Sequence, residues 1–74
     1  MDKEETLKKL GLAIRKRRLE IGITQNELAL RTNKNQQSIN RLETGGINPT
    51  YYQLLEISKG LEMSLPELIK AIDN

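Results

Sequence analysis

Four polar residues in one short stretch have side chains suited to hydrogen-bonding base edges in a DNA groove. They are Gln36, Gln37, Asn40 and Arg41. A side-chain amide can pair with adenine through a donor and an acceptor, and a guanidinium can pair with guanine through two donors. At about 100° per residue, a helix here carries all four on one side and places Ile39 and Leu42 on the other. The pattern predicts a helix that packs by its apolar side and reads DNA by its polar side.

The residues before this stretch predict another short helix and a tight turn. Thr24 is placed to cap that helix and Glu27 to reach back to it, which is the capping-box pattern. Ala29 allows two helices to cross closely, and Asn33 tolerates the left-handed conformation that a turn needs. Residues 24–44 therefore predict a helix-turn-helix motif, with Asn35 as the cap of its second helix. The alternative is an ordinary amphipathic hairpin whose amides are merely solvated.

Apolar periodicity and capping residues predict three more helices. The first runs from about Glu4 to Ile21 and ends at Gly22. Thr50 and Ser64 cap the last two, each with a capping box. The inward-facing residues are expected to be Leu7, Leu10, Ile14, Ile21, Leu54, Leu55, Ile57 and Leu61, with Tyr52 more exposed. No segment has a strand pattern. We therefore expect an all-α fold, a compact five-helix bundle forming a single domain over residues 1–74.

The positive charge is concentrated in the first part of the chain. The net charge is +2, but residues 8–41 contain nine Lys or Arg and only two Glu, a net charge of +7. Residues 1–7 carry −2 and residues 42–74 carry −3. Such a distribution suits a polyanionic partner. The run 15–18 circles its helix, so only part of it can face DNA, and Arg15 or Lys16 is the candidate for phosphate contact.

The composition disfavours an enzyme. The chain has no Cys and no His, which excludes thiol nucleophiles, disulfides, imidazole acid–base chemistry and the usual zinc ligands. Gly45-Gly46 lacks the strand and Lys of a phosphate-binding loop. We expect no metal, no cofactor and no small-molecule ligand. With no long apolar segment and no signal peptide, the expected location is the cytoplasm.

Residues 10–69 resemble the lambda-repressor-like helix-turn-helix family, which includes Cro and the lambdoid phage repressors. The resemblance rests on Gly11, Ile14-Arg15, Arg18, Gly22-Ile23-Thr24-Gln25, Glu27-Leu28-Ala29, Gln36-Gln37-Ser38-Ile39, Leu42-Glu43, Gly45, Pro49-Thr50, Leu54, Ile57, Leu61, Ser64-Leu65 and Glu67-Leu68. The family has a bundle of five helices and binds operator DNA, usually as two-fold dimers. The chain departs from it in three places: Arg17 stands where many members have Leu, Asn33 replaces the common turn Gly, and residues 45–48 lack Lys and Arg.

The resemblance implies roles for individual residues. Gln36, Gln37 and Arg41 match base-reading positions, and Asn40 shares their face. Gln25 matches a residue that contacts phosphate and braces the recognition helix. Arg18 and Glu43 match a buried ion pair. Tyr51 matches an apolar position, which implies that it packs in the core. The expected contacts with the DNA backbone come from Arg15, Thr24, Gln25, Lys34, Asn35 and Thr44.

The expected partners are double-stranded DNA and a second copy of the chain. Helix 65–72 is more apolar than a short terminal helix needs, so the expected dimer contact is Met63, Leu65, Ile69 and Ile72, unless these residues simply pack inward. The leading hypothesis is a repressor-type transcription regulator that binds a pseudo-palindromic operator. The alternatives are an antitoxin-like module that binds a toxin and represses its own operon, and an adaptor that does not read DNA.

Overall fold

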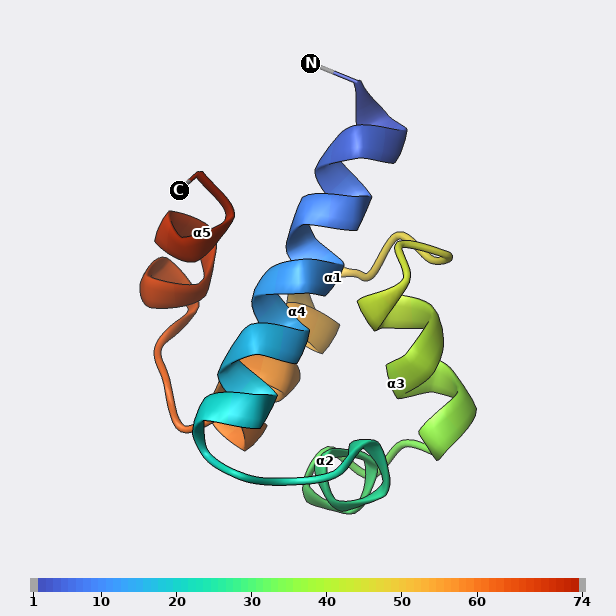
Figure 1. The fold of residues 1–74 in the computed structure, drawn as a ribbon, viewed down its shortest axis with the longest axis vertical. Coiled ribbons are helices and arrows are strands. Elements are labelled where there is room, and N and C mark those ends of the chain that lie inside the picture. Colours follow the sequence, from blue (N-terminus) through green and yellow to red (C-terminus); the bar gives the residue numbers. More distant parts are fainter. Residues whose placement is uncertain (1, 74) are drawn as a thin grey trace.

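A computed structural model describes residues 2–73, which form five helices and no strand (Figure 1). The helices are α1 (Lys3–Glu20), α2 (Gln25–Arg31), α3 (Gln36–Glu43), α4 (Tyr51–Gly60) and α5 (Leu65–Asp73). The expected all-α five-helix bundle is confirmed. The first helix begins one residue earlier than expected, because Asp2 accepts a hydrogen bond from the amide of Glu4 and serves as its cap.

The helix starts follow local sequence signals. Thr24 and Asn35 accept hydrogen bonds from the amides of Glu27 and Ser38 and so cap α2 and α3. The capping boxes Thr50–Gln53 and Ser64–Glu67 have both of their bonds. The second bond of the capping box expected at Thr24, from its backbone amide to the side chain of Glu27, is not found among the described residues. The carboxylate of Glu27 instead lies 3.6 Å from Nη2 of Arg31, one helical turn further on.

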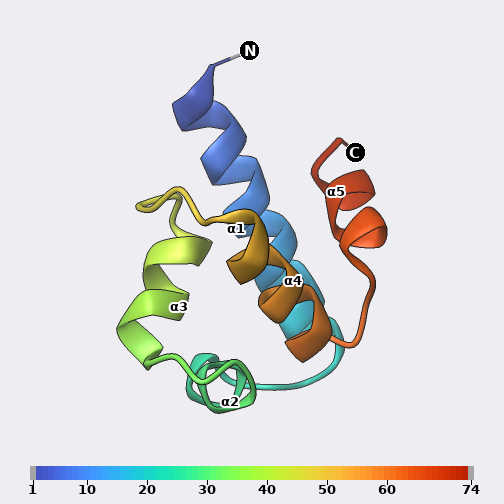
Figure 2. The ribbon, with the colours of Figure 1, turned by 180° about the vertical axis from the view of Figure 1, so that it is seen from behind.

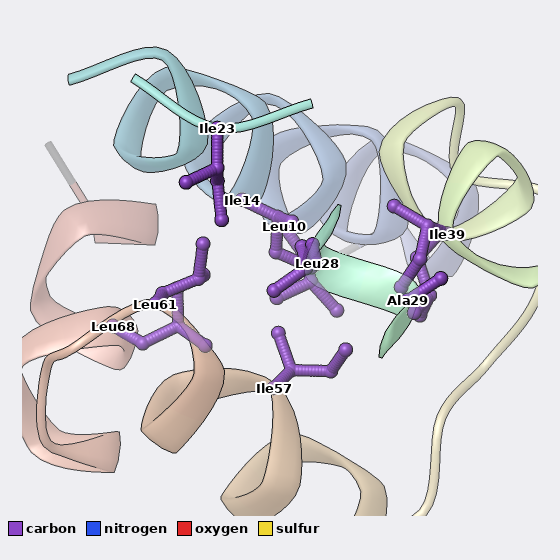
Figure 3. Packing of buried hydrophobic residues seen from close by; sticks show 10 residues of the cluster. Leu10, Ile14, Ile23, Leu28, Ala29, Ile39, Ile57, Leu61 and Leu68 are labelled. Atoms are coloured by element: carbon purple, nitrogen blue, oxygen red, sulfur yellow. The ribbon is translucent and has the colours of Figure 1, made fainter. Parts of the chain in front are cut away.

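One apolar cluster lies between the helices (Figure 3). Its buried members are Leu10, Ile14, Ile23, Leu28, Ala29, Ile39, Leu42, Ile57, Leu61 and Leu68. All five helices contribute, so the position of α3 is fixed by the same core that holds the rest of the molecule.

The long first helix lies between α3 and α5, which are on opposite sides of it in both views (Figures 1 and 2). Gly11 makes the close approach of α1 to α3 possible. A Cβ atom at this position would lie 2.3 Å from the carbonyl oxygen of Glu43. The end of α3 is therefore seated directly on the first helix.

The end of α4 is held by two arginines from other helices. Arg17 donates to the carbonyl oxygens of Leu61 and Glu62 at 2.9 and 3.1 Å, and Arg31 donates to that of Gly60 at 3.0 Å. Helix C-terminal carbonyls lack partners within the helix and carry partial negative charge, so both contacts are favourable. Arg17, which stands where many members of the similar family have Leu, thus has a structural role.

Two expectations about burial are wrong. Tyr51 is 69% exposed, and Leu55 is 38% exposed. The core under α4 is made by Ile57 and Leu61, toward the end of the helix, so Tyr51 in its first turn extends past the core.

Candidate nucleic-acid interface

The polar residues predicted to read bases lie together on the outer side of α3. Gln36, Gln37, Asn40 and Arg41 are all exposed, whereas Ile39 and Leu42 are buried. With Gln25 of α2, the four polar residues line one shallow hollow in the surface. The chain thus presents three amides, a fourth from the neighbouring helix and a guanidinium to a single ligand.

A buried ion pair lies beneath this face. Nε of Arg18 is 2.6 Å from Oε2 of Glu43, and Nη2 is 3.0 Å from Oε1, so the pair is bidentate. The two side chains are only 9% and 3% exposed. Nη1 of Arg18 also donates to the carbonyl oxygen of Ile23 at 2.9 Å. The hydrogen bond to Glu43 raises the pKa of Arg18 above its ordinary value, against the opposing effect of burial.

Gln25 connects the ion pair to the surface. Its amide nitrogen donates to Oε1 of Glu43 at 3.1 Å and to Oδ1 of Asn40 at 3.2 Å. Gln25 is the first residue of α2, so this side chain links the two helices of the motif at their polar edge. The bracing role that the resemblance implied for Gln25 therefore has a specific geometry here.

The turn between α2 and α3 depends on Asn33, which adopts a left-handed conformation at φ 54°. The amide of Lys34 then donates to the carbonyl oxygen of Ala29 at 2.8 Å and closes the turn. The hydroxyl of Thr32 donates to the carbonyl oxygen of Leu28 at 2.8 Å. These local bonds satisfy the end of α2 and set the direction in which α3 begins.

The residues expected to contact the DNA backbone fall into two groups. Arg15 is exposed and lies four residues beyond Gly11, on the side of α1 that faces α3. Lys34 instead pairs with Glu56 of α4 at 3.2 Å, and its side chain is only 15% exposed. No sequence signal joins Lys34 to Glu56, because the two lie 22 residues apart.

The threonine and asparagine candidates also make bonds within the protein. Thr24 and Asn35 use a side-chain oxygen to cap their helices, and the hydroxyl of Thr44 donates to the carbonyl oxygen of Asn40 at 3.0 Å. All three are nonetheless exposed at the ends of α2 and α3. Lys8, which the sequence placed only among the cations of residues 8–41, also lies in this region, because its backbone and side chain lie beside Gly45 in the loop after α3. Its spacing of three from Gly11 is the signal that could have placed it there.

Residues 2–73 hold neither a grouping of side chains typical of a metal site nor a helix that could span a membrane. No group of three or more acidic side chains is arranged to hold a metal ion within this range. None of the five helices is both long enough and apolar enough to cross a membrane.

Comparisons with known proteins agree with this architecture. A family pattern described as Helix-turn-helix matches residues 14–68. An uncharacterized HTH-type transcriptional regulator, y4dJ of Sinorhizobium fredii, is 36% identical over 66 residues, which cover 89% of this chain and 86% of that protein.

Solved structures of similar proteins superpose over most of the chain. The wild-type restriction-modification controller protein C.Esp1396I is 35% identical, with a TM-score of 0.85 over 92% of this chain and 87% of that one. The controller protein C.AhdI from Aeromonas hydrophila is 25% identical, with a TM-score of 0.87 over 92% of this chain and 99% of that one. A structure of the C.Esp1396I tetramer with its natural 35 base-pair operator has a TM-score of 0.80 at 38% identity and covers 93% of this chain and 96% of that one. With a motif seated on a shared core and a family pattern spanning most of its length, this chain belongs to the helix-turn-helix family.

Proposed function

We propose that the chain is a sequence-specific regulator of transcription, of the repressor type, that places α3 in the major groove of double-stranded DNA. The observation that carries the proposal is the outer face of α3. Four base-compatible side chains lie on it, while the opposite side of the helix is buried in the core. A helix fits the major groove, and amide and guanidinium groups can distinguish the base edges there.

The relatives support this proposal. The Sinorhizobium fredii protein is described as a transcriptional regulator, and C.Esp1396I has been solved on its operator. The sequence of this chain aligns with the first over 89% of its length, and its fold superposes on the second over 93%. Similar placement of α3 against DNA is the simplest use of a similar surface.

The proposed base contacts come from Gln36, Gln37, Asn40 and Arg41, and the backbone contacts from Thr24, Gln25, Asn35, Thr44, Arg15 and Lys8. Lys34 joins the backbone contacts only if DNA displaces it from Glu56, because the two are ion-paired. The loop 45–48 contributes backbone amides rather than cations. Such contacts to phosphate set the register, and the base contacts set the sequence preference.

We further propose that two copies bind a pseudo-palindromic operator. Recognition helices about 34 Å apart meet successive major grooves on one side of the duplex. The contact surface differs from the one expected from sequence, because Met63, Leu65 and Ile72 pack against the core. Ile69 remains 42% exposed on α5, and α4 adds the exposed Tyr51, Tyr52 and Leu55. These four apolar side chains of the last two helices form the proposed dimer surface.

A second candidate role, binding of another protein, is favoured by a groove between α1 and α5. Leu12, Ala13, Met63, Ala71 and Ile72 supply its apolar lining. Leu12 is 63% exposed there. The groove is lined by α1 and α5, and α5 lies on the opposite side of α1 from α3 (Figures 1 and 2). A protein partner such as a toxin and the operator could therefore be bound at once.

Selection of random DNA duplexes by the purified chain tests the main proposal. We expect one preferred sequence, arranged as an inverted repeat. Gln36→Ala and Arg41→Ala should each weaken binding to it by about 1–3 kcal/mol and relax the preference at their own positions. Arg15→Ala is the matched control, and it should weaken binding evenly across sequences and reduce the salt dependence. If the two α3 variants bind every duplex as the parent does, α3 is not the reading element.

A further inference from the structure

A continuous series of hydrogen bonds leads from the buried ion pair to the exposed face of α3. Arg18 donates to Glu43, Gln25 donates to Glu43, and the same amide nitrogen of Gln25 donates to Asn40. The series joins α1, α2 and α3. Its last member, Asn40, is one of the residues proposed to contact bases.

The direction of every bond in this series is fixed by chemistry. A guanidinium can only donate, and a carboxylate paired with it can only accept. Gln25 must therefore turn its amino group, rather than its oxygen, toward Glu43. Because that amino group also reaches Asn40, Asn40 must meet it with its oxygen. Reversing either amide would set two oxygens or two amino groups against each other.

We propose that the buried ion pair, acting through Gln25, sets the hydrogen-bonding polarity of Asn40, so that Asn40 presents its amino group to DNA and binds acceptors. The inference rests on the proposed function, because it concerns what α3 reads. In the major groove, guanine, adenine and thymine offer acceptors, whereas cytosine offers an N4 amino donor. Asn40 should consequently disfavour cytosine, and Gln25 is the positioning residue. Phosphate oxygens are also acceptors, so a backbone contact has the same polarity.

The neighbouring amides provide a contrast within the same surface. The amino group of Gln25 donates to Glu43 and Asn40 and not to Gln36 or Gln37. No comparable bond among the described residues orients the amides of Gln36 and Gln37. Either of these can rotate its amide by a half turn and pair with a donor or an acceptor. A fixed polarity at one position beside adjustable ones is the pattern to be tested.

The first measurement uses the protein without DNA. In NMR spectra of the parent, the side-chain amide protons of Gln25 should exchange with water more slowly than those of Asn40, because only the former are donated within the protein. Protected Asn40 protons together with freely exchanging Gln25 protons would mean the opposite orientation and would overturn the inference. This readout remains valid even if the chain fails to select any DNA sequence, so failure of the proposed function can be told apart.

The second measurement compares selected DNA sequences for the parent, Gln25→Met and Asn40→Asp. Gln25→Met keeps the length of the side chain and removes its donor. Cytosine should then become tolerated at one position of the DNA site. This is the position whose base preference also changes in Asn40→Ala. Asn40→Asp keeps an acceptor for Gln25 but removes the donor facing DNA, so the preference there should shift toward bases that donate. Gln37→Ala is the control and should leave this position unchanged.

If Asn40→Ala alters no base preference, replacement of single phosphates by neutral methylphosphonates identifies a backbone contact. One replacement should then weaken the parent about threefold to tenfold and leave Asn40→Ala unaffected, since a typical hydrogen bond contributes about that much. Gln25→Met should lose most of this sensitivity. The proposal is overturned if the parent prefers cytosine at the position of Asn40, if Gln25→Met retains the preference or sensitivity of the parent, or if neither bases nor phosphates respond to Asn40→Ala.

Discussion

The two sides of the molecule expose different kinds of surface. On the α3 side, an exposed amide is bonded through Gln25 to a buried ion pair, so part of the polar surface is anchored in the core. On the α4–α5 side, three exposed apolar side chains belong to helices α4 and α5, and none of them is part of the core cluster. They are Tyr51, Tyr52 and Ile69. The polar side chains of the α3 side are partly held in place before binding, whereas the α4–α5 side offers exposed apolar surface without such bonds.

This difference matches what each surface would bind. A duplex offers donors and acceptors at fixed positions, so side chains held in advance lose less freedom on binding. A second copy of the chain offers an apolar surface, which contributes in proportion to its area and needs little orientation. The comparison predicts that substitutions on the α3 side act on stability and specificity together, whereas those on the α4–α5 side leave the folded monomer almost unchanged.

The largest effect is expected at the ion pair. Arg18→Ala or Glu43→Ala leaves one buried charge without its partner and should lower the free energy of unfolding by about 3–5 kcal/mol. Denaturant unfolding followed by circular dichroism measures this. Lys9→Ala is the control, because its pair with Glu5 at 3.5 Å is exposed and contributes at most about 1 kcal/mol. Equal stability of parent and Glu43→Ala would show that the α3 side is not anchored as described.

A smaller loss of stability is expected from a substitution at the contact between α1 and α3. Ala favours helices over Gly by about 1 kcal/mol, but at position 11 its Cβ would lie 2.3 Å from the carbonyl oxygen of Glu43. The steric overlap should outweigh the gain in helix propensity, so Gly11→Ala should destabilise the protein by about 1–3 kcal/mol. Gly46→Ala is the matched control, because its nearest contact is an ordinary 3.5 Å. A Gly11→Ala protein that melts above the parent would contradict the close crossing.

The exposed tyrosines should matter little to the monomer. Tyr51→Ser and Tyr52→Ser remove side chains that lie largely in solvent, so the free energy of unfolding should change by no more than about 0.5 kcal/mol. Together with Ile69→Glu, they should weaken self-association, as measured by analytical ultracentrifugation with and without operator DNA. A large loss of monomer stability would show that this side is structurally essential, and unchanged assembly would remove it as the dimer surface.

The smallest effect concerns the cap of α5. The amide of Ser64, and then its hydroxyl, lower the pKa of Glu67 below its ordinary 4.5. A carboxyl with a lowered folded-state pKa adds stability above its unfolded pKa and loses it as the pH falls through the folded value. The difference between the parent and Glu67→Gln should therefore be present at about pH 6 and vanish in stronger acid. Unfolding curves across this range test it, and a pH-independent difference would argue against the charged cap.

Sequence alone predicted the features that depend on neighbouring residues. The caps at Thr24, Asn35, Thr50 and Ser64 and the left-handed turn at Asn33 are determined within a few positions along the chain. The polar and apolar sides of α3 follow from helical periodicity in the same way. The fold class was accessible for that reason. Which of the predicted side chains contact DNA stays a prediction.

Contacts that depend on how helices cross were not predictable. Lys34 bonds to Glu56, and Arg17 bonds to carbonyl oxygens 44 and 45 residues away, because α1, α2 and α4 meet there. Tyr51 shows the opposite error: an apolar residue near a helix start was expected inside, but the core lies under the other end of that helix. Hydrophobicity indicates which residues can be buried, and the crossing of helices decides which ones are.

The inward use of several cations has a consequence for how the protein would distribute itself in a cell. Arg17, Arg18, Arg31 and Lys34 are four of the nine cations between residues 8 and 41, and each bonds to a carbonyl or carboxylate of its own chain. Affinity for arbitrary DNA rises with the number of phosphates neutralised, since each one releases condensed counterions. With fewer cations available for this, bulk chromosomal DNA should retain the protein weakly. A larger share of a small number of copies would then reside on the operator, and occupancy would respond to copy number rather than to the amount of competing DNA.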